Sequence, residues 1–140
     1  MTVPQLARRL GMERHPEGGW FVRTWAATPT VRTPTGTRPT ATLIHFLLPA
    51  GETSAWHAVV SDEVWLWHGP GELELQLGGA GNAPEETGPV RRLGPGADAS
   101  CQVLVPAGTW QRTLPCREDV LVSCLVSPGF DYADWKLFTQ

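Results

Sequence analysis

The sequence predicts an all-β barrel or sandwich preceded by one short helix. Short segments rich in apolar and β-branched residues recur along most of the chain, and turn residues separate them. The 140 residues include 15 Gly and 13 Pro, which indicates many turns. This length is usual for one domain, and no repeat or linker divides residues 1–140, so we expect a single domain.

The helix is expected near the N-terminus, from Thr2 to Gly11. Thr2 can cap this helix, Pro4 suits its first turn, and Gly11 can end it. Residues 27–39 are rich in Thr and Pro, which predicts a loop, mobile over a pocket. Strands are expected at residues 20–25, 40–48, 54–60, 63–68, 72–77, 90–93, 101–105, 109–114 and 119–126, with a short helix or extended tail at 131–138.

Charge and composition exclude several classes of function. The formal net charge is -3 and no run of Lys or Arg occurs, which argues against a nucleic-acid partner. No apolar run could cross a bilayer, and the N-terminus lacks the apolar region of a secretory signal, so we expect a cytoplasmic protein without a membrane partner. Three cysteines (Cys101, Cys116 and Cys124) suggest neither a disulfide framework nor a zinc knuckle, and reduced, mostly buried thiols fit better.

The stretch from Gly51 to Gly69, GETSAWHAVVSDEVWLWHG, carries the first candidate site. His57 and Glu63 lie on extended chain at a spacing that lets them converge inside a barrel. Alternation places His57 and Val59 on one face of their strand. Imidazole titrates near neutral pH, so His57 is a candidate general base, with a hydrogen-bonded core histidine as the alternative. Glu63 can orient His57 or a ligand hydroxyl, or lie solvated at the rim.

Two blocks resemble the paired motifs of the cupin superfamily. The first is Gly51-x5-His57-x-Val59-x3-Glu63-x5-Gly69, and the second is the Pro-x-Gly centre of VPAGTWQ at 105–111. Together with HPEGGWF at 15–21, SAWHAVVSDEVW at 54–65 and SPGFDYADW at 127–135, this second block makes the chain similar to the cupin-5 subfamily. The resemblance implies a double-stranded β-helix, or jelly-roll, barrel with a pocket between the two motifs, and a homodimer.

The resemblance also implies where a metal would bind, and the sequence departs from that pattern. Metal-binding cupins have histidines where this chain has Val59 and Gln111. His57, Glu63 and Gln111 would remain as ligands, and an amide oxygen is a poor replacement for imidazole. We therefore expect no cofactor beyond a weakly bound divalent metal.

Further candidates for ligand binding surround this pair. Trp65 and Trp67 share the face of Glu63 by alternation, and either wall the pocket or fill the core. Gln111 lies on a polar strand face with Thr109 and Thr113, which suits a polar pocket. His45 is a further candidate, because its polar tip could point inward. Glu17 and Arg23 are two more, which either bind an anionic group of the ligand or form a surface ion pair.

The sequence leaves two functions open. One is an enzyme, of isomerase, epimerase or lyase type, that transfers protons without a metal on a small polar, sugar-like or aromatic metabolite. His57 and Glu63 would be its catalytic residues. The other is a non-catalytic module that binds such a metabolite in the same pocket.

Overall fold

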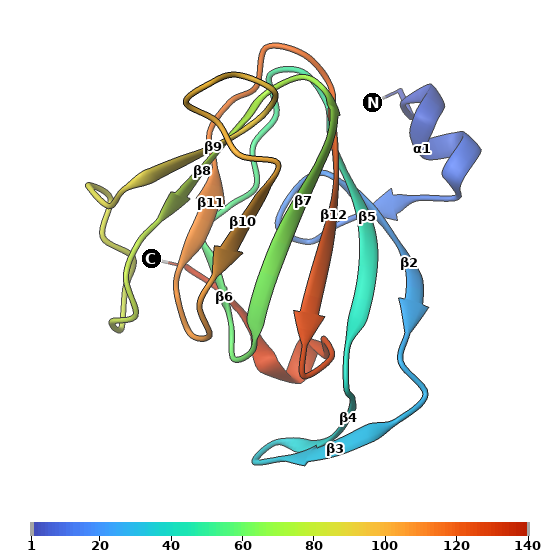
Figure 1. Cartoon of the computed structure of the whole chain (residues 1–140), viewed down its shortest axis with the longest axis vertical. Helices are drawn as coiled ribbons and strands as arrows, with labels where there is room; N and C mark the ends of the chain where they lie inside the picture. Colours follow the sequence, from blue (N-terminus) through green and yellow to red (C-terminus); the bar gives the residue numbers. More distant parts are fainter. Residues whose placement is uncertain (1, 140) are drawn as a thin grey trace.

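Two antiparallel sheets face each other and form a barrel in the computed structural model, which describes residues 2–139 (Figure 1). The larger sheet has the order β1 (Glu13–Arg14), β2 (Trp20–Ala26), β5 (Thr42–Leu48), β12 (Val120–Ser127), β7 (Asp62–Pro70) and β10 (Gln102–Val105). The smaller sheet has the order β13 (Trp135–Leu137), β6 (His57–Val59), β11 (Gln111–Thr113), β8 (Leu73–Leu77) and β9 (Val90–Leu93). The predicted all-β class is confirmed.

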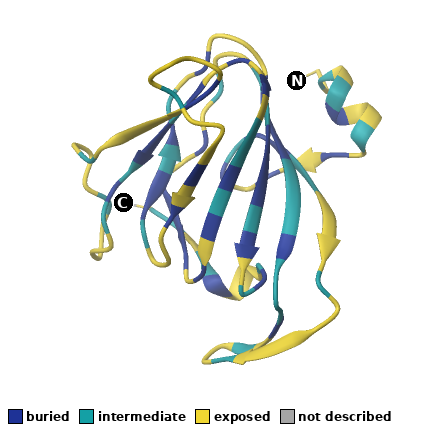
Figure 2. Cartoon of the chain, in the orientation of Figure 1, coloured by how far each residue is buried: buried dark blue, intermediate teal, exposed yellow. Residues whose placement is uncertain are grey.

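The core fills the space between the two sheets. Alternating residues of the strands point inward, which is why buried and less buried positions alternate along much of β7 and along β10 (Figure 2). Phe46 and Trp65 meet edge to face there, with ring centroids 5.8 Å apart. Leucines and valines close one end of the barrel around them, including Leu48, Leu73 and Val120.

The N-terminal helix α1 (Gln5–Leu10) packs on the outside of the larger sheet (Figure 1). Its Ala7 is fully buried in a cluster with Trp20 and Leu47. Gly11 ends the helix in the left-handed conformation, as predicted. The predicted cap at Thr2 is wrong, because Pro4 is the N-cap residue and no side chain caps the helix.

The predicted loop at residues 27–39 is a β-hairpin. It consists of β3 (Thr30–Thr33) and β4 (Gly36–Pro39), and it projects beyond the barrel (Figure 1). The short helix η1 (Tyr132–Asp134) lies at the same end of the molecule, next to the hairpin. Arg38 and Asp134 join the two elements through an ion pair of 2.8 Å between Nε and Oδ2.

Two smaller predictions concern thiols and membrane spans. Cys116 and Cys124 are buried, whereas Cys101 is exposed, and all three are free thiols. Among residues 2–139, no helix has the length and apolar character needed to span a membrane.

Candidate functional site

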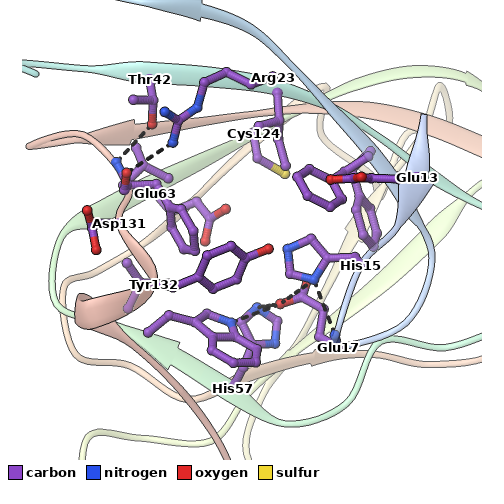
Figure 3. Close-up of a pocket in the computed structure, with 17 residues that line it drawn as sticks. Glu13, His15, Glu17, Arg23, Thr42, His57, Glu63, Cys124, Asp131 and Tyr132 are labelled. Carbon is purple, nitrogen blue, oxygen red and sulfur yellow. Dashed lines mark hydrogen bonds and ion pairs between the residues drawn. The ribbon is translucent and has the colours of Figure 1, made fainter. Parts of the chain in front are cut away.

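A cavity of about 430 Å³ opens at the barrel end that carries η1. Both sheets contribute to its wall, as do the turn before β2 and the segment from Phe130 to Trp135 (Figure 3). His15, Glu17, His57 and Glu63 line it and are each at least nine-tenths buried. The cavity therefore brings two imidazoles and two carboxyl groups together, away from bulk water.

The turn HPEGG at 15–19 places Glu17 beside His57. Gly18 and Gly19 both have positive φ angles, of 109° and 79°. A Cβ atom at Gly18 would collide with the carbonyl oxygen of Thr53, so this turn packs directly on the backbone before β6. The Ala55 N–H donates to the Glu17 carbonyl at 2.7 Å and completes that packing.

One proton lies between His57 and Glu17. His57 Nδ1 is 2.7 Å from the Ala55 carbonyl oxygen, which can only accept, so Nδ1 carries a hydrogen. His57 Nε2 is 3.1 Å from Glu17 Oε2. Because neutral His57 then has only a lone pair at Nε2, this contact needs a proton that either Glu17 or His57 carries.

Burial decides where that proton resides at neutral pH. It raises the pKa of Glu17 to about 8 and lowers the pKa of His57. Glu17 is therefore the protonated partner and donates to a neutral His57. Trp135 Nε1 also donates to Glu17 Oε2, at 3.3 Å.

His15 is held as a neutral imidazole on the other side of Glu17. Its Nδ1 accepts from the Glu17 backbone N–H at 3.2 Å. Burial, and then the charge of His57, lower the pKa of His15 to about 4. His15 therefore adds an uncharged polar wall to the cavity.

Glu63 has a separate set of partners. Trp65 Nε1 donates to Gln111 Oε1 at 2.9 Å, and an indole N–H can only donate, which fixes the orientation of the Gln111 amide. Gln111 Nε2 must then donate to Glu63 Oε1, at 2.7 Å. Burial raises the pKa of Glu63 to about 7, while His57 and the Gln111 hydrogen bond lower it. Near pH 7, Glu63 can give or take a proton.

The family comparison agrees with this architecture. The family model Cupin_5, described as Cupin superfamily (DUF985), matches residues 4–138. The chain belongs to the Cupin_5 family. The predicted resemblance and the predicted cupin barrel are therefore confirmed.

Solved structures resemble this cupin over nearly its whole length. A hypothetical protein from Leishmania major is 28% identical, with a TM-score of 0.86, and the match covers 99% of this chain and 88% of that one. A protein from Shewanella oneidensis is 29% identical, with a TM-score of 0.85 and coverage of 99% and 85%. Pac13 from Streptomyces is 16% identical, with a TM-score of 0.61 and coverage of 91% and 84%, and it shares the fold. No curated protein matches the chain.

The residues of this cupin do not fit the metal site that some cupins hold. Val59 offers no donor, and both ends of the Gln111 amide are used by Trp65 and Glu63. Within residues 2–139, no group of three or more His, Cys, Asp or Glu side chains has the arrangement needed to hold a metal ion.

Three predicted site residues converge in this cupin. His57 and Glu63 line the cavity, and Gln111, fully buried, reaches it through Glu63. The prediction that Glu63 holds His57 is wrong, because the carboxyl group in contact with the ring is that of Glu17. The alternative of a surface ion pair between Glu17 and Arg23 is also wrong, because Glu17 is buried. Arg23 Nη2 instead donates to the Phe130 carbonyl at 3.0 Å.

Other predicted residues lie away from the cavity. His45 is on the outer face of β5, where its ring is 6.0 Å from that of His68, because its neighbours Ile44 and Phe46 take the inward positions. Trp65 and Trp67 point inward but fill the core below the cavity. Trp67 Nε1 donates to the Gly71 carbonyl at 2.7 Å.

Several residues that line the cavity had no predicted role. Three of them, His15, Tyr132 and Trp135, lie in the HPEGGWF and SPGFDYADW blocks. The sequence signal that could have identified them as site residues was that these blocks belong to the family pattern. Cys124 also lines the cavity, and burial raises the pKa of its thiol well above the usual value. That thiol stays protonated, which agrees with the structural role expected for it.

Proposed function

We propose that this cupin is an enzyme that transfers protons, without a metal, on a small polar metabolite bound in the cavity. The observation that carries the proposal is the contact of 3.1 Å between His57 Nε2 and Glu17 Oε2 in the wall of the cavity, which requires one shared proton. A histidine that only fills a core has no need of a buried carboxyl group, here that of Glu17, next to its Nε2 atom.

The arrangement supports a reaction with two proton-transferring groups. The pair of Glu17 and His57 donates its proton to the metabolite, and Glu63 takes a proton from it, or the roles reverse. Glu63 suits this role because its pKa is raised to about 7, close to the working pH. Gain and loss of a proton at two positions of one ligand is the chemistry of isomerases, epimerases and lyases.

Fold relatives support the same class by analogy. Pac13 is described as a nucleoside dehydratase, so a barrel of this shape can act on a small molecule. The proposed reaction type rests on the site and not on that likeness. The homodimer that the family resemblance implies remains part of the proposal, and light scattering of the purified protein measures it.

The test is exchange of carbon-bound hydrogen with solvent deuterium. Wild-type protein is incubated with a panel of sugar-like, aromatic and other small polar compounds in heavy water, and NMR follows deuterium incorporation. We expect exchange with at least one compound that binds, and we expect it to survive dialysis against a metal chelator.

Substitutions assign the exchange to this site. His57→Gln and Glu17→Gln should each slow it by about a hundredfold or more, the usual contribution of a positioned acid or base. His45→Gln is the matched control, because His45 lies on the outer face of the barrel and should leave the rate unchanged. Wild-type protein that binds a compound and never exchanges its hydrogen above the buffer rate would favour the non-catalytic binding module.

A further inference from the structure

We propose that the ligand of this cavity is a small organic cation, such as a molecule with a quaternary ammonium or related onium group. This inference shares one assumption with the proposed function, namely that the ligand binds in this cavity. Two features of the lining carry it: a box of aromatic rings and an excess of carboxyl groups.

Aromatic rings enclose the cavity on several sides. Tyr132 stands at 90° to Trp135 and at 83° to Phe130, with ring centroids 5.6 and 5.0 Å apart. His15 contacts Phe21 edge to face at 4.7 Å, and its ring is 6.3 Å from that of Tyr132 and 6.2 Å from that of Trp135. Rings at right angles form the walls of a box rather than a stack, and the close-up shows the Tyr132 ring beside His15 (Figure 3). Aromatic boxes of this kind attract cations through the negative potential of the ring faces.

The charged groups of the lining favour a positive ligand. Four carboxyl groups line the cavity, from Glu13, Glu17, Glu63 and Asp131, and among its described residues Arg23 is the one Lys or Arg. Nη2 of that guanidinium already donates to the Phe130 carbonyl. An anionic ligand would be repelled by whichever of these carboxyl groups is ionised, whereas a cation would be attracted to it.

The buried carboxyl groups keep capacity for a ligand. The contacts of Glu17 with His57, His15 and Trp135 all involve Oε2, and within residues 2–139 no hydrogen bond or ion pair involves its Oε1. Glu63 accepts from Gln111 through Oε1. Both side chains are more than nine-tenths buried and line the cavity, and the Cys124 thiol is a further partner of Glu63, so the oxygen left for a ligand is Oε1 of Glu17.

Binding of a cation should be linked to proton release. A positive charge beside Glu63 stabilises its ionised form and lowers its pKa from about 7. Below these pKa values the incoming cation expels a proton, and both Glu17 and Glu63 are ionised only well above pH 8. The affinity for a cation should therefore rise from pH 6 through pH 8 and level off only above it.

The experiment compares two probes of the same shape by calorimetric titration. Choline carries a trimethylammonium group, and 3,3-dimethylbutan-1-ol replaces its charged nitrogen by carbon. At pH 8 we expect choline to bind about tenfold or more tightly than the neutral alcohol. At pH 6.5, titrations in buffers of different ionisation enthalpy should show proton release with choline alone.

Two variants of one residue test the aromatic box. Tyr132 is 46% exposed, so its replacement should leave the barrel folded. Tyr132→Phe keeps the ring and should keep the preference for choline, whereas Tyr132→Leu removes the ring and should reduce that preference about tenfold. Equal binding of the two probes to the wild-type protein, or binding of neither at millimolar concentration, would overturn the inference. Deuterium exchange is measured separately, so a failure of the proposed reaction is distinguishable from a failure of cation selectivity.

Discussion

Gln111 has both ends of its amide engaged by buried partners. It accepts from Trp65 and donates to Glu63, and its side chain is fully buried. The hydrogen bond to Glu63 favours the ionised carboxylate and opposes the effect of burial. Gln111 therefore acts as a positioning residue that keeps the pKa of Glu63 near neutrality.

Gln111→Leu should raise the pKa of Glu63 above its present value of about 7, because the carboxylate loses a donor. The same change leaves the Trp65 N–H without an acceptor, which should cost roughly 1–3 kcal/mol of unfolding free energy. Carbon-detected NMR titration of Glu63 and denaturant unfolding measure the two effects. Gln76→Leu is the matched control, because Gln76 is also a buried amide but bonds the Glu86 and Gly88 carbonyls and Arg112 instead. An unchanged Glu63 pKa in Gln111→Leu would contradict this role.

At this scale the sequence predicted part of the site. Alternation and the cupin motif placed His57 and Glu63 in one cavity, because both signals are local to each strand. The contact between His57 and Glu17 joins residues 40 positions apart, and it depends on how the HPEGG turn packs against Thr53. Alternation also could not say which face of β5 is inward, so His45 was placed on the wrong side.

At the scale of elements, the β3–β4 hairpin and η1 form one unit beside the cavity. Arg38 of the hairpin donates through Nε to Asp134 of η1 at 2.8 Å, and Thr35 donates to the same carboxylate. The hydrogen bond from Arg38 is the main reason that the pKa of Asp134 lies below its usual value. Because η1 also carries Tyr132, this contact holds one wall of the cavity.

Arg38→Met should loosen η1 while leaving the barrel intact. Hydrogen exchange should become faster at residues 30–39 and 131–135, and ligand affinity should fall. Arg32→Met is the control on the same hairpin, because Arg32 is exposed. Equal protection of both segments in the two variants would show that the ion pair does not hold the wall.

The hairpin also shows the limit of prediction at this scale. Strands that are apolar along most of their length, such as β5 and β12, were predicted within a few residues of their observed bounds. Residues 30–39 carry Thr and Pro without apolar alternation, because β3 is largely exposed and the buried residue of β4 is the charged Arg38. A strand stabilised by pairing and by one ion pair leaves no periodic signal.

At the scale of the whole molecule, the buried titratable groups of the cavity should control how stability depends on pH. Burial raises the pKa of Glu17 to about 8 and that of Glu63 to about 7, from an ordinary 4.5. Between the ordinary pKa of 4.5 and the raised pKa of each group, the folded protein holds protons that the unfolded chain has lost. These two groups therefore make stability fall as pH rises. His15 and His57 have the opposite effect below their ordinary pKa of 6.5, because the unfolded chain binds the protons there.

The effects of the carboxyl groups and of the histidines on stability oppose each other between about pH 4.5 and 6.5. Above pH 6.5 only the carboxyl groups change the stability. We therefore expect the unfolding free energy to fall from pH 6.5 to pH 8, with a slope of about 1.4 kcal/mol per pH unit for each proton released. Denaturant unfolding at a series of pH values measures this slope. Glu17→Gln and Glu63→Gln should each flatten it, since the amide cannot titrate and Gln at position 17 can still donate to His57. Stability that is constant or rises between pH 6.5 and 8 in the wild-type protein would mean that neither carboxyl group keeps a proton in the empty cavity over this range, and it would contradict the shared proton between Glu17 and His57.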